Sequence, residues 1–355
     1  MPTIDSDAHV VETEQTWDFM DPSDSHLRPV IVTPTGGGQS FWFVDGKTRG
    51  LAKGAISAKG ISDKVTRKMD TPVAAREMED IPGRLAHMDE LGIDVQVLYP
   101  TIYINRVCDR DQTDVAMARA YNRWLASIWK QAPTRLRWAC VLPLSVMEES
   151  LKELRSSAEN GACAVMMRGI EGDRLLCDPY FFPLYEEASR LNIPIGVHIG
   201  NANNEMNDLL VNDGAGGTFS RLRLMSVAAF HALVMTGVPK MFPNLRFAFL
   251  ESSAQWVPYV LHDLVRRFDT RGKVLDSPVL KNYKLWVSCQ TDDDLPYVLK
   301  YAGEDQILTG TDYGHSDQSS EIEALRNLRA KGDISTEAAD KILYDNPKLL
   351  YNLAV

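Results

Sequence analysis

Eight short apolar segments, rich in strand-forming residues, recur along this chain and limit the folds that it can adopt. Each is bounded by polar or glycine-containing stretches, and each is long enough for one buried strand. We therefore expect eight strands, at residues 2–10, 93–99, 135–143, 161–168, 193–199, 245–251, 284–290 and 306–312.

Helix-length amphipathic stretches separate these segments. The clearest predicted helices lie at residues 112–132, 147–159, 179–191, 219–236, 254–270 and 293–303. Strands alternating with helices predict right-handed βαβ units and a parallel sheet. Eight such units in 355 residues fit a (β/α)8 TIM barrel, an α/β fold. A doubly wound open sheet is the alternative, but no glycine-rich phosphate loop follows the first predicted strand.

Two segments are too long to be simple barrel connections. Residues 13–80 separate the first predicted strand from its helix, and they contain a hairpin turn at Asp45 and Gly46. Residues 200–218 follow the fifth predicted strand. Long insertions at this end of a barrel commonly cover the active site. We expect residues 13–80 to be a lid-like insertion and 200–218 to be a second active-site loop, within a single domain spanning residues 1–355.

Charge and cysteine content narrow the classes of partner. A formal net charge of −10, with no dense basic stretch, argues against a nucleic-acid partner. The five cysteines form no C-x-x-C pair, which is typical of reduced thiols in the cytoplasm. No apolar run approaches the ~20 residues of a membrane span. We therefore expect a cytoplasmic protein whose partner is a small molecule, without contact to a membrane.

The first predicted strand carries Asp5, Asp7 and His9 in alternation, which places all three side chains on one face. Two carboxylates beside an imidazole are costly in a core unless a cation neutralises them. Oxygen and nitrogen ligands suit one divalent ion, zinc or manganese. The alternative is that Asp7 and His9 form a hydrogen-bonded structural pair. Asp5 lies one step deeper, and we expect it to have a structural role.

Later predicted strands also end in polar residues. In a barrel, side chains at the carboxyl ends of the strands face one shared mouth. We therefore expect Asp7 and His9 to meet a set of distant residues there, namely Arg168, His198, Glu251, Gln290 and Asp312, with His315 just beyond the last strand.

This arrangement resembles the amidohydrolase superfamily, in particular the amidohydrolase-related branch that contains aminocarboxymuconate semialdehyde decarboxylase and the resorcylate decarboxylases. The similar segments cover nearly the whole chain: IDSDAHVVE, YNRWLASI, DPYFFPLYEEASRLNIPIGVHIG, FPNLRFAFLESSAQWVPYVL and GEDQILTGTDYGHSD. The resemblance implies a metal-bearing barrel and a homo-oligomer, a dimer. It also implies a set of four metal ligands, Asp7, His9, His198 and Asp312.

Two positions depart from the pattern of the superfamily. Decarboxylases of this branch usually carry a histidine at the end of strand six, where this chain has Glu251. Glu251 is therefore the candidate general acid or base. The lysine that bridges two metals in other branches has no counterpart, because the fourth strand ends in Arg168. We therefore expect one metal ion.

Together these residues predict a metal-dependent enzyme that acts on a small anionic molecule. The candidate substrate-binding residues are Arg168, whose planar fork suits a carboxylate, and Gln290. The candidate catalytic residues are Glu251, His315 and Asp312. The resemblance favours non-oxidative decarboxylation of an aromatic or unsaturated carboxylic acid. The missing strand-six histidine favours hydrolysis by metal-bound water at an amide, ester, lactone or activated C–C bond. A non-catalytic binding protein is the remaining interpretation, and the four filled ligand positions argue against it.

Overall fold

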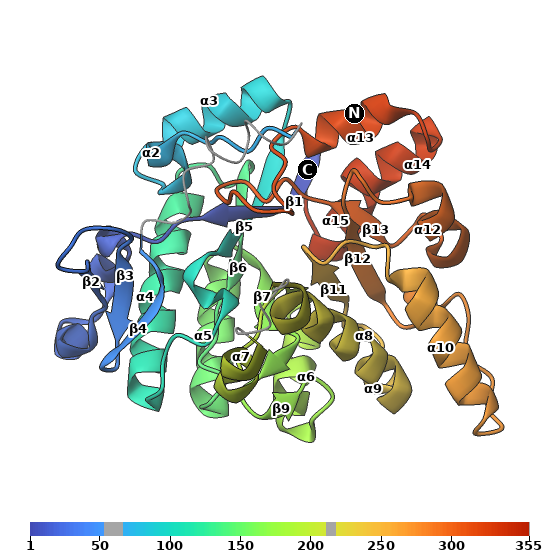
Figure 1. Cartoon of the computed structure of the whole chain (residues 1–355), viewed down its shortest axis with the longest axis horizontal. Coiled ribbons are helices and arrows are strands. Elements are labelled where there is room, and N and C mark those ends of the chain that lie inside the picture. The colour runs from blue at the N-terminus through green and yellow to red at the C-terminus, as the bar shows by residue number, and fades with distance from the viewer. Residues whose placement is uncertain (53–66, 211–217, 355) are drawn as a thin grey trace.

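A computed structural model describes residues 1–52, 67–210 and 218–354 of the chain. Within these residues, eight parallel strands form one sheet that curves into a nearly closed barrel ringed by helices (Figure 1). This confirms the predicted (β/α)8 barrel, and each strand falls on one of the predicted segments. In order around the barrel, the strands are β1 (Ile4–Val10), β5 (Val95–Pro100), β6 (Leu136–Cys140), β7 (Ala162–Arg168), β10 (Ile195–His198), β11 (Phe247–Leu250), β12 (Leu285–Cys289) and β13 (Ile307–Thr309).

The outer helices bury one apolar stripe each, as the periodicity predicts. In α10 (Val257–Asp269), the buried residues Val257, Val260, Leu261 and Leu264 recur at helical spacing. The other main helices are α3 (Ile81–Leu91), α4 (Asp111–Trp129), α5 (Met147–Glu159), α6 (Phe182–Arg190), α8 (Leu224–Thr236), α12 (Leu295–Ala302) and α13 (Ala324–Lys331). Shorter helices are α2 (Val73–Arg76), α7 (Asn204–Leu210), α9 (Val238–Met241), α11 (Val279–Asn282), α14 (Thr336–Asp340) and α15 (Asn346–Tyr351). No helix in the described ranges combines the length and the apolar character that crossing a membrane requires.

The barrel closes between its first and last strands, β1 and β13. The His9 amide donates to the Tyr313 carbonyl at 2.7 Å, and the Asp312 amide donates to the Asp7 carbonyl at 2.9 Å. Gly310 permits this approach, because a Cβ built there would lie 2.4 Å from the Cβ of Asp7. The seam therefore places the predicted metal ligands Asp7 and His9, on β1, beside the predicted ligand Asp312.

Asp5 reinforces this seam from inside the barrel. Its carboxylate is fully buried and accepts hydrogen bonds from the Thr311 amide at 2.9 Å, the Thr311 hydroxyl at 2.6 Å and the Gln96 amide at 2.9 Å. Burial nevertheless raises the pKa of Asp5 to about 6. These contacts agree with the structural role expected for Asp5.

The insertion at residues 13–80 contains a small antiparallel sheet of β2 (Val30–Val32), β3 (Phe41–Val44) and β4 (Lys47–Leu51). Asp45 and Gly46 join β3 to β4 with φ of 52° and 78°, as a type I′ hairpin turn requires, which confirms the predicted turn. The Asp45 carboxylate also accepts from the amides of Asp109 and Arg110, at 2.9 and 3.0 Å. Residues 53–66 and 211–217 lie outside the described residues, so the covering role of both insertions stays a prediction.

Candidate metal centre

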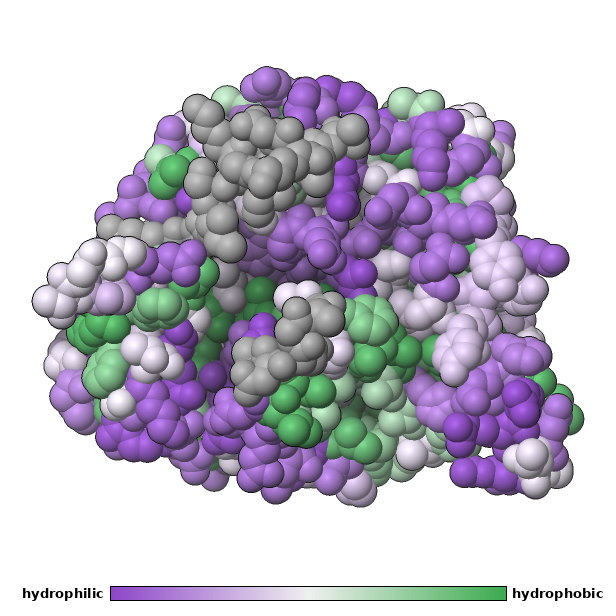
Figure 2. Space-filling model, in the orientation of Figure 1, coloured by the Kyte–Doolittle hydropathy of each residue, from purple (hydrophilic) through white to green (hydrophobic). Residues whose placement is uncertain are grey.

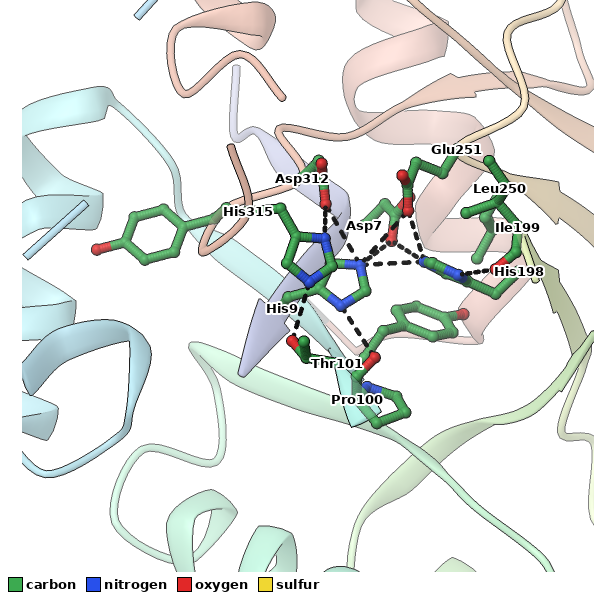
Figure 3. A network of polar contacts seen from close by, with 12 residues as sticks. Asp7, His9, Pro100, Thr101, His198, Ile199, Leu250, Glu251, Asp312 and His315 are labelled. Carbon is green, nitrogen blue, oxygen red and sulfur yellow. Dashed lines mark hydrogen bonds and ion pairs between the residues drawn. The ribbon is translucent and has the colours of Figure 1, made fainter. Parts of the chain in front are cut away.

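Six buried polar side chains converge at the carboxyl ends of the barrel strands (Figure 3). They come from β1, from the ends of β10 and β11, and from the segment that follows β13. The face shown in Figure 2 is hollowed near its centre. The barrel thus brings together six of the eight residues that the sequence predicted for the site: Asp7, His9, His198, Glu251, Asp312 and His315.

Two histidines of this cluster face each other through their Nε2 atoms. His9 Nδ1 lies 3.1 Å from the Pro100 carbonyl, and His198 Nδ1 lies 2.9 Å from the Ile199 carbonyl. Because a carbonyl only accepts, each Nδ1 carries the hydrogen and each Nε2 presents a lone pair. The two Nε2 atoms are 3.0 Å apart. Burial, followed by the charges of His315 and His198, lowers the pKa of His9 well below its usual value, so His9 stays in the neutral form that binds metals.

Three carboxylate oxygens surround these nitrogens. Asp7 Oδ1 lies 3.3 Å from His198 Nε2, and Glu251 Oε2 lies 3.2 Å from the same atom. Asp312 Oδ1 lies 3.4 Å from His9 Nε2. Asp7 Oδ1 and Glu251 Oε2 are buried and make no hydrogen bond within the described part of the chain, whereas the buried Asp312 Oδ1 faces His315 Nδ1 at 2.7 Å. Buried carboxylates without partners are strongly unfavourable, so the arrangement calls for a cation.

The donor set fits a divalent ion. Asp7, His9, His198 and Glu251 each offer one atom, and these atoms lie within 4.8 Å of one another. An overlapping group consists of His9, Glu251, Asp312 and His315. Oxygen and imidazole donors suit zinc or manganese. The predicted ligands Asp7, His9, His198 and Asp312 are therefore brought together, and Glu251 reaches the same point.

Unusual backbone conformations direct Glu251 and Asp312 toward the centre. Both residues follow the end of a barrel strand, and both have left-handed φ angles, 58° and 52°. Such conformations are strained for residues other than glycine, so neighbouring contacts must hold them. The Glu251 amide donates to the Ser288 hydroxyl at 2.8 Å. The Asp312 amide is held by Asp7 at the barrel seam, as described above.

A carboxylate that the sequence analysis missed supports the turn after Glu251. Asp293 is buried and accepts from the Ser253 hydroxyl at 2.5 Å, the Ala254 amide at 2.8 Å and the Gln290 amide at 2.9 Å. Ser253 also has a left-handed φ, of 60°. Asp293 therefore joins the ends of β11 and β12 and fixes the turn that carries Glu251. The sequence offered one signal for a role of Asp293 at the site, namely its position just after a predicted strand.

Burial and charge shift the acidity of the remaining groups. Burial, then the charges of Asp312, Asp317 and Asp7, raises the pKa of Glu251 well above its usual value. Burial opposes protonation of His315, but the nearby Asp312 carboxylate outweighs it and raises the pKa of His315 to about 9. The two groups touch, with His315 Nδ1 2.7 Å from Asp312 Oδ1. Glu251 and His315 therefore both favour the protonated form near neutral pH.

Thr101, another residue that the sequence analysis missed, orients the His315 ring. The Thr101 hydroxyl donates to the Val10 carbonyl at 2.7 Å, so it accepts from His315 Nε2 at 2.9 Å. The His315 ring also stacks on that of His9, with centroids 3.9 Å apart. His315 is thus held between Thr101 and Asp312 in one orientation.

Neither predicted substrate-binding residue forms a hydrogen bond or an ion pair with the six cluster residues in the described part of the chain. The Arg168 guanidinium binds Glu171 through Nε at 2.9 Å and through Nη2 at 2.5 Å, while Nη1 donates to the carbonyls of Tyr103 and Asn105. Arg168 also lines a cavity of about 130 Å³ that none of the six cluster residues lines. These contacts favour a structural role, and anchoring by Arg168 stays a prediction. Gln290 follows β12, its buried Nε2 has no partner in the described ranges, and its role also stays a prediction.

Comparisons with known proteins agree with this fold. A family model described as amidohydrolase matches residues 4–353. The 2-amino-3-carboxymuconate-6-semialdehyde decarboxylase of Dictyostelium discoideum is 23% identical over 242 residues. That match covers 65% of this chain and 65% of the relative, just under two thirds of each.

Solved structures share the fold over nearly the whole chain. An amidohydrolase from Mycobacterium avium subsp. paratuberculosis superposes with a TM-score of 0.77 and 18% identity, covering 99% of both chains. The 5-carboxyvanillate decarboxylase of Novosphingobium aromaticivorans, solved with manganese and 4-hydroxy-3-methoxy-5-nitrobenzoic acid, gives a TM-score of 0.70 at 18% identity. It covers 99% of this chain and 96% of that one. At these identities the likeness concerns the fold.

Proposed function

The chain belongs to the amidohydrolase family, as its motifs indicated, and from that premise we propose that it is a metal-dependent carboxy-lyase. Its substrate is a small anionic aromatic or unsaturated carboxylic acid, which loses CO2 without oxidation. One observation carries the proposal: Asp7 Oδ1 and Glu251 Oε2, both buried without hydrogen-bond partners among the described residues, converge with Asp312 Oδ1 on two imidazole Nε2 atoms. The relatives named as decarboxylases support the choice of reaction.

Asp7, His9, His198 and Asp312 hold the ion in this proposal. When bound, a divalent ion supplies a concentrated positive charge that polarises a substrate oxygen. His9 and His198 already present their lone pairs to one point, because backbone carbonyls orient both rings. His315 binds Asp312 and thereby keeps that carboxylate turned toward His9.

Glu251 is the proton donor of the proposed reaction. Decarboxylation breaks the bond between the carboxyl group and a substrate carbon, CO2 leaves, and that carbon needs a proton. The raised pKa of Glu251 keeps its carboxyl group protonated near neutral pH, which suits a general acid. Its Oε2 atom points at the same place as the ligand atoms of His9 and His198. His315, whose pKa is raised to about 9, is a second protonated group in the same cluster.

Hydrolysis of an amide, ester, lactone or activated C–C bond is the second candidate. A pair of neighbouring carboxylates, Glu251 and Asp312, favours it, because the ionised form of either one can accept a proton from water. The high proton affinity of Glu251 favours the acid role over this basic one. A cytoplasmic homodimer remains our proposal for the setting of the enzyme, with zinc or manganese as its ion.

Metal analysis and product analysis together test the proposal. Elemental mass spectrometry should find about one divalent ion per chain in the wild type and little in His198→Ala. Screening of aromatic and unsaturated carboxylates should then find one that releases CO2, with no oxygen from H2¹⁸O in the product. Oxygen incorporation would select hydrolysis instead. No bound metal in either protein after supplementation would exclude the proposed chemistry.

A further inference from the structure

An anionic substrate needs a cation at the mouth of a site that is rich in carboxylates. Asp7, Asp312 and, when it is ionised, Glu251 place negative charge around the ion, and the protonated His315 offsets part of that charge. Arg168 is already paired with Glu171, and backbone carbonyls accept from its Nη1. A further cation for the substrate carboxylate would therefore come from another element.

A π-helical turn, η5 (Phe219–Arg223), leads into α8. The side chain of Asn201, which follows β10, donates to the Arg221 carbonyl at 3.0 Å. The start of α8 also packs against the end of β7, because a Cβ built at Gly169 would lie 2.3 Å from the Met225 backbone. Irregular helical turns of this kind are frequent at functional sites.

Arg223 points from this turn toward the loop that supports Asp312. Its Nη2 atom donates to the Ser319 hydroxyl at 3.3 Å. The next residue, Ser320, donates to Asp312 Oδ2 at 2.6 Å. The neighbouring residues Ser319 and Ser320 thus link the guanidinium of Arg223 to the metal cluster.

The charge of Arg223 is not neutralised by a direct ion pair. Arg223 is half-buried, and among the described residues it forms no contact with a carboxylate within ion-pair distance. Its Nη2 contact with Ser319 is the one hydrogen bond that this side chain makes within the described ranges, which leaves its other donors available to a ligand there.

We propose that Arg223 is the specificity-determining residue that binds the carboxylate of the substrate at the mouth of the site. This inference rests on the proposed function, because it assumes an anionic substrate above the metal centre. A guanidinium can bind a carboxylate through two parallel hydrogen bonds, which fixes the orientation of the ligand as well as its charge. The carboxylate replaces the long contact that Arg223 makes with Ser319.

The test compares a carboxylate with its neutral counterpart on the manganese-loaded full chain. Calorimetric titration measures binding of 2,6-dihydroxybenzoate and of resorcinol, which lacks the carboxylate. The variants are Arg223→Gln and Arg223→Lys, with Arg221→Gln as the matched control because it removes the same charge from the same turn. Arg223→Gln should weaken dihydroxybenzoate binding about 10- to 100-fold, the usual worth of hydrogen bonds to charged groups. Resorcinol binding should stay within about twofold, and Arg223→Lys should fall between.

Each other outcome overturns the inference and shows where it failed. Equal loss of both ligands in Arg223→Gln would mean a structural role. Loss in Arg221→Gln instead would assign the anchor to Arg221. A wild type that holds manganese but binds no dihydroxybenzoate would exclude the anchor and leave the metal centre intact. A wild type that holds no manganese would refute the proposed function as well.

Discussion

Replacing Glu251 with glutamine separates proton transfer from metal binding. Glutamine keeps the size of the side chain and leaves the hydrogen bond from the backbone amide of residue 251 to the Ser288 hydroxyl in place, but it cannot donate a carboxyl proton. General acids contribute about 10²- to 10⁴-fold, or about 3–5 kcal/mol of transition-state stabilisation. Glu251→Gln should therefore lower kcat by about that factor in the CO2-release assay, with its metal content unchanged.

The same variant should be more stable than the wild type when metal is removed. The pKa of Glu251 is raised in the folded state, so the folded protein binds the extra proton and loses stability as pH rises above the unfolded value. Glutamine lacks this penalty. The difference in unfolding free energy between the variant and the wild type should be small near pH 4. Toward pH 8 it should grow by about 1.4 kcal/mol for each pH unit between the unfolded-state and the folded-state pKa of Glu251. Urea unfolding in EDTA at several pH values measures it.

Asp312→Asn is the matched control, because it removes a neighbouring carboxylate of the same cluster. This variant should lose the metal, since Asp312 Oδ1 is a proposed ligand atom. The reasoning is refuted if Glu251→Gln loses the ion while Asp312→Asn keeps it, which would make Glu251 the ligand. Full activity of Glu251→Gln would equally remove it from the reaction.

Three further changes test the supports of the site. Asp293→Asn should lower kcat about 10- to 100-fold with metal retained, because it loosens the turn that positions Glu251; an unchanged kcat would contradict this role. Arg168→Gln should cost about 3–5 kcal/mol in unfolding free energy, because Glu171 would be left buried and charged, and a normal denaturation midpoint would argue for the substrate role instead. Between pH 4 and pH 7, the unfolding free energy of the metal-free wild type should fall by about 3 kcal/mol more than that of Asp5→Asn, because the pKa of Asp5 is raised in the folded state. Thermal unfolding at several pH values measures this, and parallel pH profiles of the two proteins would refute it.

The barrel was predictable because each strand needed only local information. Apolar runs followed by amphipathic helices and glycine-containing turns are visible over ten to twenty residues. The barrel rule then placed His198 beside His9 although 189 residues separate them. The same rule placed Asp312 and His315 correctly, because both lie at or just after the end of a strand.

Side chains that act through their partners were not predictable in this way. Arg168 was predicted to bind a substrate carboxylate, and the sequence pattern did not indicate that Glu171, three residues later, forms a buried ion pair with its guanidinium. Arg223 lies in a helix with nothing in its neighbourhood to mark it, and its importance comes from a loop almost one hundred residues away. Such pairings depend on the rotamers and loop paths that the folded chain selects, which residue patterns do not encode.

The barrel seam also determines when the site can form during synthesis. Asp5 and Thr311, which lock the seam, are 306 residues apart. Asp7 and His9 therefore leave the ribosome roughly 300 residues before Asp312 and His315. The proposed ion site is complete only after β13 and the segment that follows it have been made. Formation of that site is thus coupled to closure of the barrel.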